Sequence, residues 1–253
     1  MGELSGRSAL VTGGGSGLGR AIALAFAEQG AGVMIAGRRD APLAETSSAG
    51  SGRIRRVVAD VTIEEDRRRL IDTTVAQLGG LDILVNSAGI LEGGTIETTT
   101  LQAWDRSMDI NVRSVFALTR LATPHLEARR GNILMLSSVA GTRAYPGVLA
   151  YCVSKAAVDQ LTRCLALELA PKGVRVNALN PGVVVTNLHR AGGMSESDYA
   201  AFLERGKTTH PLGRVGAPED VAALALFLAT DRAAWITGGT FSVDGGRALA
   251  SAR

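Results

Sequence analysis

The stretch TGGGSGLG, residues 12–19, lies between a short apolar run, Ala9–Thr12, and a helical segment, Gly19–Gln29. Glycines lack a Cβ atom, so the backbone can turn sharply here and approach a pyrophosphate closely. The N-terminus of the following helix presents free N–H groups and a favourable dipole to the same anion. A merely flexible turn would also be rich in glycine, but a strand before it and a helix after it favour a nucleotide-binding turn.

Short β-rich runs alternate with helical segments along the rest of the chain. The expected strands are Ala9–Thr12, Val33–Ala36, Val57–Ala59, Ile83–Val85, Ile133–Ser137, Arg175–Leu179 and Phe241–Val243. The expected helices include Gly19–Gln29, Glu64–Leu78, Leu101–Arg129, Val153–Leu169 and Pro218–Thr230. Most of the strands are continuous apolar runs, as is typical of parallel strands covered on both faces. The alternation predicts one α/β domain, residues 1–253, with a doubly wound, Rossmann-type parallel sheet of about seven strands.

The composition excludes several classes of protein. The 27 basic and 24 acidic residues are interspersed, so no basic stripe predicts a nucleic-acid partner. No run approaches the roughly 18 apolar residues of a membrane span, and residues 1–6 lack the apolar core of a signal peptide. We therefore expect a cytoplasmic protein that binds neither nucleic acid nor membranes. No pair of His or Cys residues has the spacing of metal ligands, so we expect no metal site.

Tyr151 and Lys155 are four residues apart on a predicted helix and therefore project from one face. A free phenol has a pKa of about 10, and a nearby ammonium lowers it, which would suit the pair to acid/base catalysis. A surface tyrosine beside a solvated lysine has the same spacing. Only three of the 27 basic residues are lysines, however. A chain so rich in arginine would carry arginine at an unconstrained position, so Lys155 indicates a need for a compact ammonium.

The second strand leads through Gly37 into Arg38 and Arg39. NAD-binding domains of this type usually carry an acidic residue at the position of Gly37, where it accepts the ribose hydroxyls. An arginine can instead clamp a 2′-phosphate through charge-assisted hydrogen bonds. Asp40 can either reach a ribose hydroxyl or pair with Arg39. The pattern favours NADP(H), with NAD as the alternative.

The glycine-rich stretch has the spacing T-G-x-x-x-G-x-G, and with it the chain resembles the short-chain dehydrogenase/reductase (SDR) family. The resemblance is to its single-domain branch, in particular to members like the 3-oxoacyl-acyl-carrier-protein reductases, and extends from Ser5 to Gly246. Further blocks follow in order: Asp60-Val61, NSAG at 86–89, Asn111, Ser138, Tyr151-x-x-x-Lys155, PGVVVT at 181–186 and VDGG at 243–246. Ser87 stands where the family usually has a second asparagine.

The resemblance implies an oxidoreductase that transfers a hydride between NADP(H) and a carbonyl or secondary alcohol, with a proton moving through Tyr151. It implies a catalytic tetrad of Asn111, Ser138, Tyr151 and Lys155. Together with Arg38, the implied cofactor-binding residues are Gly13, Gly15, Ser16, Gly17, Leu18, Gly19, Asp60, Val61, Asn86, Ala88, Gly89, Tyr151, Lys155, Pro181, Gly182, Val184 and Thr186. A non-catalytic, dinucleotide-binding redox sensor is the alternative, but such a protein would tolerate the loss of Tyr151 or Lys155.

Two members of the implied tetrad have alternative interpretations. Ser138 follows the strand Ile133–Ser137, at the edge where open α/β sheets bind ligands, but Ser137 competes with it and only the family spacing selects Ser138. No G-x-S-x-G elbow surrounds Ser138, so we do not expect a nucleophile. Asn111 lies inside a predicted helix, where an amide does not favour helix formation. It either faces solvent or, as the resemblance implies, holds a water that connects Lys155 to bulk solvent.

Residues 187–214 form the one long stretch without an expected strand. Gly192-Gly193 and several apolar side chains suit a mobile lid over the substrate, although an ordinary surface excursion has a similar composition. Ala144, Pro146, Val148 and Leu149 add no charge near the catalytic residues. We therefore expect a largely uncharged, moderately apolar carbonyl or alcohol substrate, with Arg143 or His189 leaving room for an acidic group.

The expected assembly is a homotetramer or a homodimer. The predicted helices Leu101–Arg129 and Val153–Leu169 carry apolar residues over more than one face, among them Val115, Phe116, Leu161 and Leu165. A helix that is apolar beyond a single stripe must bury the remainder against a neighbour. The resemblance implies that these helices pair across a two-fold axis.

Overall fold

The computed structural model of the chain describes residues 2–250. Its centre is a seven-stranded sheet with the order β3-β2-β1-β4-β5-β6-β7, in which every neighbouring pair is parallel. The strands are β1 Ser8–Thr12, β2 Gly32–Gly37, β3 Ile54–Val58, β4 Ile83–Asn86, β5 Asn132–Leu136, β6 Arg175–Pro181 and β7 Thr240–Val243. The predicted doubly wound, Rossmann-type sheet is confirmed. The strand order reverses between β1 and β4, which opens a ligand-binding crevice at the carboxyl ends of the strands.

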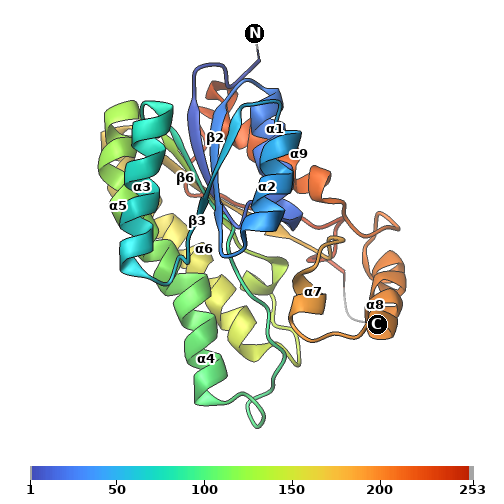
Figure 1. Cartoon of the computed structure of the whole chain (residues 1–253). Helices are drawn as coiled ribbons and strands as arrows, with labels where there is room; N and C mark the ends of the chain where they lie inside the picture. Colours follow the sequence, from blue (N-terminus) through green and yellow to red (C-terminus); the bar gives the residue numbers. More distant parts are fainter. Residues whose placement is uncertain (1, 251–253) are drawn as a thin grey trace.

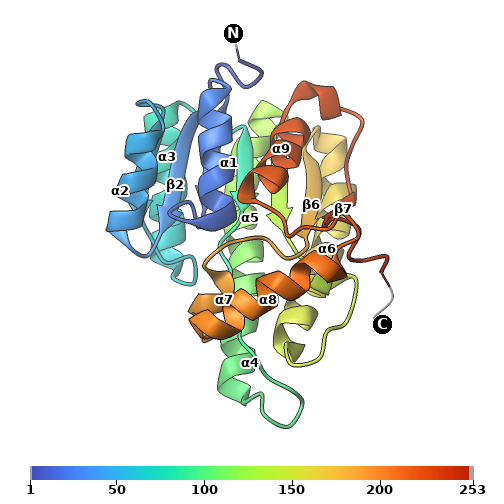
Figure 2. The ribbon, with the colours of Figure 1, turned by 90° about the vertical axis from the view of Figure 1, so that its right-hand side faces the viewer.

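Helices cover both faces of the sheet (Figure 1). One face carries α1 Gly17–Glu28, α2 Asp40–Ala49 and α9 Pro218–Ala229, and the other carries α3 Glu64–Leu78, α5 Ser114–Arg129 and α6 Leu149–Leu169. Two further helices, α7 Leu188–Ala191 and α8 Glu196–Thr209, lie beyond one end of the sheet (Figure 2). Within residues 2–250, no helix is both long and apolar enough to cross a membrane.

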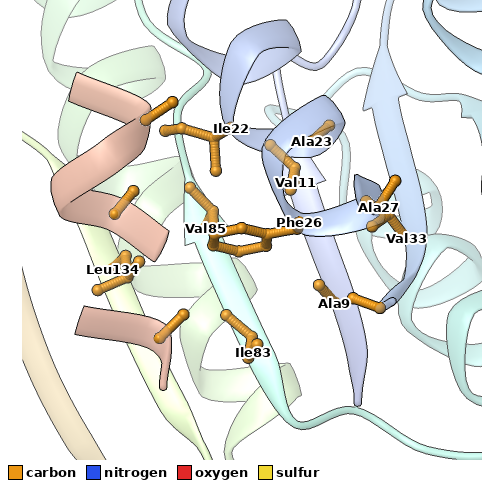
Figure 3. Close-up of a cluster of buried hydrophobic side chains, with 14 of the residues drawn as sticks. Ala9, Val11, Ile22, Ala23, Phe26, Ala27, Val33, Ile83, Val85 and Leu134 are labelled. Carbon is orange, nitrogen blue, oxygen red and sulfur yellow. The ribbon is translucent and has the colours of Figure 1, made fainter. Parts of the chain in front are cut away.

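The interiors of the central strands are continuously apolar because both of their faces are buried. All five residues of β1 are buried, and its side chains alternate between two cores. Ala9 and Val11 pack under α1 and α9, whereas Leu10 packs under the helices of the opposite face. Figure 3 shows the first of these cores, in which Phe26 of α1 lies beside Ile83 and Val85 of β4.

Three helical segments differ from the prediction. The helix α2 is not expected from the sequence, because only Leu43 and Thr46 of it are buried and no apolar period marks it. The expected helix Leu101–Arg129 consists of α4 Leu101–Met108, a π-helical turn η1 Asp109–Arg113, and α5. The helix α6 begins at Leu149 rather than at Val153, so that Tyr151 lies in its first turn.

Candidate active site

The glycine-rich turn connects β1 to α1 at the carboxyl edge of the sheet. Gly13 and Gly17 have φ angles of 68° and 52°, in the left-handed region that favours glycine. A Cβ atom on Gly13 would lie 3.1 Å from the backbone of Ala88, and one on Gly19 would lie 2.5 Å from the carbonyl oxygen of Gly13. The side chain of Ser16, the N-cap of α1, makes no capping hydrogen bond. The first N–H groups of α1 therefore remain available to an anion.

This turn is tied to the end of β4 by Thr12. Its Oγ1 accepts hydrogen bonds from the backbone N–H groups of Ser87 and Ala88, both at 3.0 Å. The amide of Asn86 is buried and donates to Oγ1 of Thr119 at 3.0 Å. Asn86 thus stabilises the end of β4. Ala88 and Gly89 line the cavity beside the glycine-rich turn, and Asn86 does not.

A cavity of about 240 Å³ lies along the turn and the ends of β2, β3 and β4. The predicted cofactor residues that line it are Gly13, Gly15, Ser16, Arg38, Asp60, Val61, Ala88 and Gly89. Leu18, Tyr151, Pro181, Gly182, Val184 and Thr186 line a second, neighbouring cavity. Gly17, Gly19, Asn86 and Lys155 line neither. The glycine cradle and the free helix N-terminus fit a dinucleotide in the first cavity.

The carboxylate of Asp40, the first residue of α2, is bound by an arginine of β3. Its Oδ1 accepts a hydrogen bond from Nε of Arg56 at 2.8 Å, which holds the pKa of Asp40 below its usual value. The alternative in which Asp40 pairs with Arg39 is therefore wrong, because Asp40 pairs with Arg56 on the neighbouring strand β3. Among residues 2–250, Arg38 and Arg39 have no carboxylate partner, and both line the cavity.

Tyr151, Lys155 and Ser138 form a buried cluster between α6 and the end of β5. Nζ of Lys155 lies 5.6 Å from the centre of the Tyr151 ring and donates to the carbonyl oxygen of Leu136 at 2.7 Å. Ser138 caps the short 3₁₀ turn Val139–Gly141, and its Oγ accepts the N–H of Ala140 at 3.1 Å. Tyr151 and Ser138 both line the second cavity.

Asn111 lies in the π-helical turn η1 and is 1% exposed. Its Oδ1 accepts the N–H of Ile90, and its Nδ2 donates to the Ile90 carbonyl and to Oγ of Ser154, at 2.9, 2.9 and 3.1 Å. A Cβ atom on Gly89 would lie 3.2 Å from Oδ1 of Asn111 and 3.6 Å from Nζ of Lys155. The solvent-facing alternative for Asn111 is thereby excluded, and the four predicted catalytic residues lie around one point. Single-turn π-bulges are frequent at functional sites.

Residues 13–248 match the family model described as enoyl-(acyl carrier protein) reductase. A short-chain dehydrogenase/reductase of Caenorhabditis elegans, solved with cofactor, superposes with a TM-score of 0.93 at 35% identity, covering 98% of this chain and 97% of that one. The chain belongs to the short-chain dehydrogenase/reductase family. It is an oxidoreductase of this family, whose members bind NAD or NADP.

Relatives of this SDR protein carry different names. A 3β-hydroxysteroid dehydrogenase of Eggerthella lenta is 40% identical, covering 98% of this chain and 95% of the relative. An L-fucose dehydrogenase of Bos taurus is 37% identical, covering 98% and 92%. A 3-oxoacyl-[acyl-carrier-protein] reductase of Thermotoga maritima is 34% identical, covering 96% and 98%. Steroid, sugar and acyl groups all appear among these names, so the family does not by itself identify the substrate.

Burial controls the protonation of the catalytic pair in this SDR protein. It raises the pKa of Tyr151 to about 12, and a hydrogen bond with the Ser138 hydroxyl opposes the rise. It lowers the pKa of Lys155 to about 8, and the carboxylate of Asp159 opposes the fall. The sequence predicts that the ammonium lowers the phenol pKa. In the structure the pKa of the phenol is instead raised, because burial withdraws the phenol from water and disfavours its charged form.

The second cavity has a volume of about 730 Å³. Its apolar lining includes Leu91, Pro146, Val148, Leu188, Met194 and Phe202, from the loops around the catalytic cluster and from α7 and α8. The segment 187–214, expected as a substrate loop, therefore does border the cavity. His189 also lines it, 4.5 Å from the Phe202 ring, and burial lowers the pKa of its imidazole.

Three arginines near this cavity differ from the expectation. The role expected of Arg143 is wrong, and the sequence pattern does not indicate the other two. Arg143, expected to leave room for an acidic group, instead donates from Nη1 to the carbonyls of Arg247, Ala248 and Ala250 at 3.1, 2.9 and 2.7 Å. Arg205 and Arg247, which were not singled out, line the cavity. The period of α8 places Phe202 and Arg205 near one face, but no signal in the sequence shows that this face borders the catalytic cluster.

Proposed function

We propose that this protein transfers a hydride between NADP(H) and a carbonyl or secondary alcohol, with Tyr151 as the general acid and base. The observation that carries the proposal is that Tyr151 and Ser138 line the 730 Å³ cavity, with Nζ of Lys155 buried 5.6 Å from the Tyr151 ring. That cavity adjoins a glycine cradle whose helix N-terminus is free to bind a pyrophosphate. A redox sensor without catalysis would not require a buried phenol and ammonium beside an apolar cavity.

The nicotinamide cofactor supplies or accepts the hydride when it is bound. In the direction of reduction, the Tyr151 phenol donates its proton to the substrate oxygen as the carbon gains the hydride. A pKa of about 12 keeps that proton in place at neutral pH until the oxygen becomes negative. The Ser138 hydroxyl orients the oxygen, and the Lys155 ammonium stabilises the phenolate that remains. Asn111 fixes the backbone of Ile90 next to Gly89, close to that ammonium.

The choice of NADP(H) over NAD rests on the end of β2. The acidic residue that would accept ribose hydroxyls is replaced by Gly37, and Asp40 is bound by Arg56. Arg38 and Arg39 line the 240 Å³ cavity, where a 2′-phosphate would meet two guanidinium groups.

We further propose that the protein acts as a cytoplasmic homotetramer.

A panel of ketones, aldehydes and secondary alcohols tests this function. The absorbance of the reduced cofactor is followed with each compound, in both directions, with NADPH or NADP⁺ and with NADH or NAD⁺. We expect turnover of at least one class of compound and a higher kcat/KM with the phosphorylated cofactor. Binding of the cofactor without turnover of any compound would favour the sensor alternative.

A further inference from the structure

Two arginines share the cavity that contains the catalytic residues. Arg205 comes from α8 and Arg247 from the segment after β7, and both line the cavity together with Ser138 and Tyr151. In the part of the chain that the structure describes, neither guanidinium has a carboxylate within ion-pair distance. Neither residue has a role in the proton transfer described above.

Both arginines are connected to the C-terminal part of α8. Arg205 and Thr209 are four residues apart on this helix, so their side chains are neighbours on one face. Arg247 donates a hydrogen bond from Nη1 to Oγ1 of Thr209. This bond holds Arg247 against the end of α8, one helical turn from the Arg205 backbone, and the Arg247 guanidinium also lies 5.3 Å from the centre of the Tyr145 ring.

The backbone that carries Arg247 is held in place from two sides. Arg143 donates to its carbonyl and to that of Ala248. The carboxylate of Asp244 accepts the N–H groups of Gly246 and Ala248 at 3.0 and 2.6 Å. Arg143 is therefore a positioning residue for Arg247. Its own guanidinium donates to backbone carbonyl oxygens.

The acidic groups nearby do not neutralise the pair. Asp198 also lines the cavity, but it precedes Arg205 by seven residues of α8, about 10 Å along the helix axis. Its Oδ2 accepts a hydrogen bond from Oγ of Ser195 at 2.7 Å. Glu204 pairs with Lys207 at 2.6 Å, outside the cavity. Two positive charges without a carboxylate partner on the wall of one cavity favour an anion there.

We propose that Arg205 and Arg247 form an anion subsite and that the substrate is a carbonyl or alcohol bearing a carboxylate. The proposal rests on the proposed function, because the same cavity must hold the reacting carbon at Tyr151. Guanidinium forks match the geometry of a carboxylate. The apolar remainder of the lining, which includes Met194 and Phe202, suits an aliphatic chain between the two ends. The substrate thus combines an apolar body with an acidic terminus.

The test compares 5-oxohexanoate and 7-oxooctanoate with their methyl esters, as ligands of the enzyme saturated with NADP⁺ in calorimetric titrations. We expect at least one acid to bind the wild type about ten-fold more tightly than its ester, as one charge-assisted hydrogen bond would produce. The double variant R205Q/R247Q should lose that preference. Lys207→Gln removes a charge from the same helix outside the cavity and should retain it.

Acids that bind no tighter than their esters, or that do not bind at all, overturn the subsite. So does a preference that survives in R205Q/R247Q while thermal unfolding shows that variant to be folded. Because binding is measured without turnover, a failure of the proposed hydride transfer would appear separately, as a wild type that turns over none of the carbonyl panel.

A different observation concerns the buried carboxylate of Asp159, one turn after Lys155 on α6. Asp159 is 2% exposed, and Nδ2 of Asn180 donates to its two oxygens at 3.1 and 2.9 Å. The same Nδ2 lies 2.9 Å from the carbonyl oxygen of Ser138. Oγ of Ser137 donates to the Lys155 carbonyl at 3.1 Å. The end of β5 and the catalytic turn of α6 are thus joined through Asp159 and Asn180.

We propose that Asp159 and Asn180 are positioning residues for Ser138 and Lys155. The titratable groups next to Lys155 are Tyr151 and Asp159, both on α6, and Arg163 of the same helix acts on Asp159. The contacts from β5 and β6 come from Ser137, Ser138 and Asn180, which carry no charge. Asp159 is therefore the negative charge that favours the ammonium form of Lys155.

Asp159→Asn tests this role, and Thr162→Val is the control. Thr162 is a buried residue of the same helix whose hydroxyl donates to the carbonyl oxygen of Val158, within α6. We expect kcat of the variant to fall about ten-fold with little change in KM, and the alkaline limb of the pH profile to move to lower pH. If the variant does not fold, Asn180→Ser should still lower kcat with little change in KM. The proposal is overturned if Asp159→Asn keeps the wild-type kcat and its alkaline limb does not move. It is also overturned if a folded Asn180→Ser keeps the wild-type kcat.

Discussion

Burial sets opposite protonation tendencies on two adjacent side chains of the active site. Withdrawal from water disfavours a charge on Tyr151 and on Lys155 alike, so the tyrosine keeps its proton more firmly and the lysine gives up its proton more readily. At neutral pH the pair is a protonated phenol beside an ammonium. That state is the one required to donate a proton to a reduced carbonyl oxygen and to stabilise the phenolate afterwards.

The pKa of Lys155 gives a prediction for the pH dependence of reduction. The folded-state pKa is about 8, so the ammonium is present below that pH and is lost as the pH rises through it. The kcat for carbonyl reduction should therefore fall on the alkaline side of about pH 8, well before free lysine titrates. A pH profile under saturating cofactor and substrate measures this. A kcat that stays constant to pH 10 would contradict it.

Arg38 gives a prediction for cofactor choice. Arg38→Ala should weaken NADPH binding about ten-fold at low salt, with little effect on NADH, because one charge-assisted contact with the 2′-phosphate is lost. Fluorescence titration with both cofactors measures the two affinities. Arg68→Ala, which removes an exposed arginine that pairs with Glu64 on α3, serves as the control. A wild type that prefers NADH would refute the role of Arg38.

Residue types and spacing could predict the catalytic cluster, but not its electrostatics or its surroundings. The spacing of Tyr151 and Lys155 places both on one helix face, whereas Ser138, which follows β5, is selected over Ser137 only by the family spacing. The pairing of Asp40 with Arg56 depends on two strands lying next to each other, and the hold of Arg143 on the C-terminal segment joins residues more than 100 positions apart. Such contacts leave no local pattern, which is why Arg205 and Arg247 went unrecognised.

At the scale of elements, the strands were the most predictable parts of the chain. Both faces of β1, β4 and β5 are buried, so each strand has at least three consecutive apolar residues, with polar residues only at the strand ends. The helix α2 buries too few residues to show a period. The π-helical turn η1 inserts extra backbone into a helix whose sequence continues smoothly, and it carries Asn111 to the active site.

The segment 187–214 contains α7 and α8 and borders the substrate cavity. The Tyr199 hydroxyl donates to the carbonyl of Thr186 at 2.9 Å, and His189 contacts Phe202, so the segment is anchored to the end of β6 and packed on itself. We expect it to act as a lid. Hydrogen exchange should show added protection of 187–214 with NADPH and a substrate analogue together. Protection of residues 12–19 alone would show that the lid prediction is wrong.

At the scale of the whole molecule, the surface of α5 and α6 bears on assembly. Of the apolar residues expected at an interface, Val115 is buried in the core, and Leu161 and Leu165 are partly buried and pack against that core. Phe116, Val153 and Leu167 remain exposed on these helices. Trp235, before β7, is 99% exposed.

These exposed side chains predict an oligomer with more than one interface. Sedimentation equilibrium at micromolar concentration should give a particle of four chains, each of 26.2 kDa. Val153→Arg places a charge on the exposed face of α6 and should reduce the particle to dimers or single chains while the fold persists. A wild type that sediments as a monomer would contradict the prediction.

The most direct measurement compares the wild type with Tyr151→Phe in a single-turnover assay of NADPH oxidation with a carbonyl substrate found in the panel. The substitution removes the hydroxyl and leaves the ring in place. We predict a loss of at least about a hundred-fold in rate, within the range that general acid catalysis contributes, with NADPH affinity by fluorescence titration nearly unchanged. A Tyr151→Phe enzyme that oxidises NADPH at a rate close to that of the wild type would contradict the assignment of Tyr151 as the proton donor.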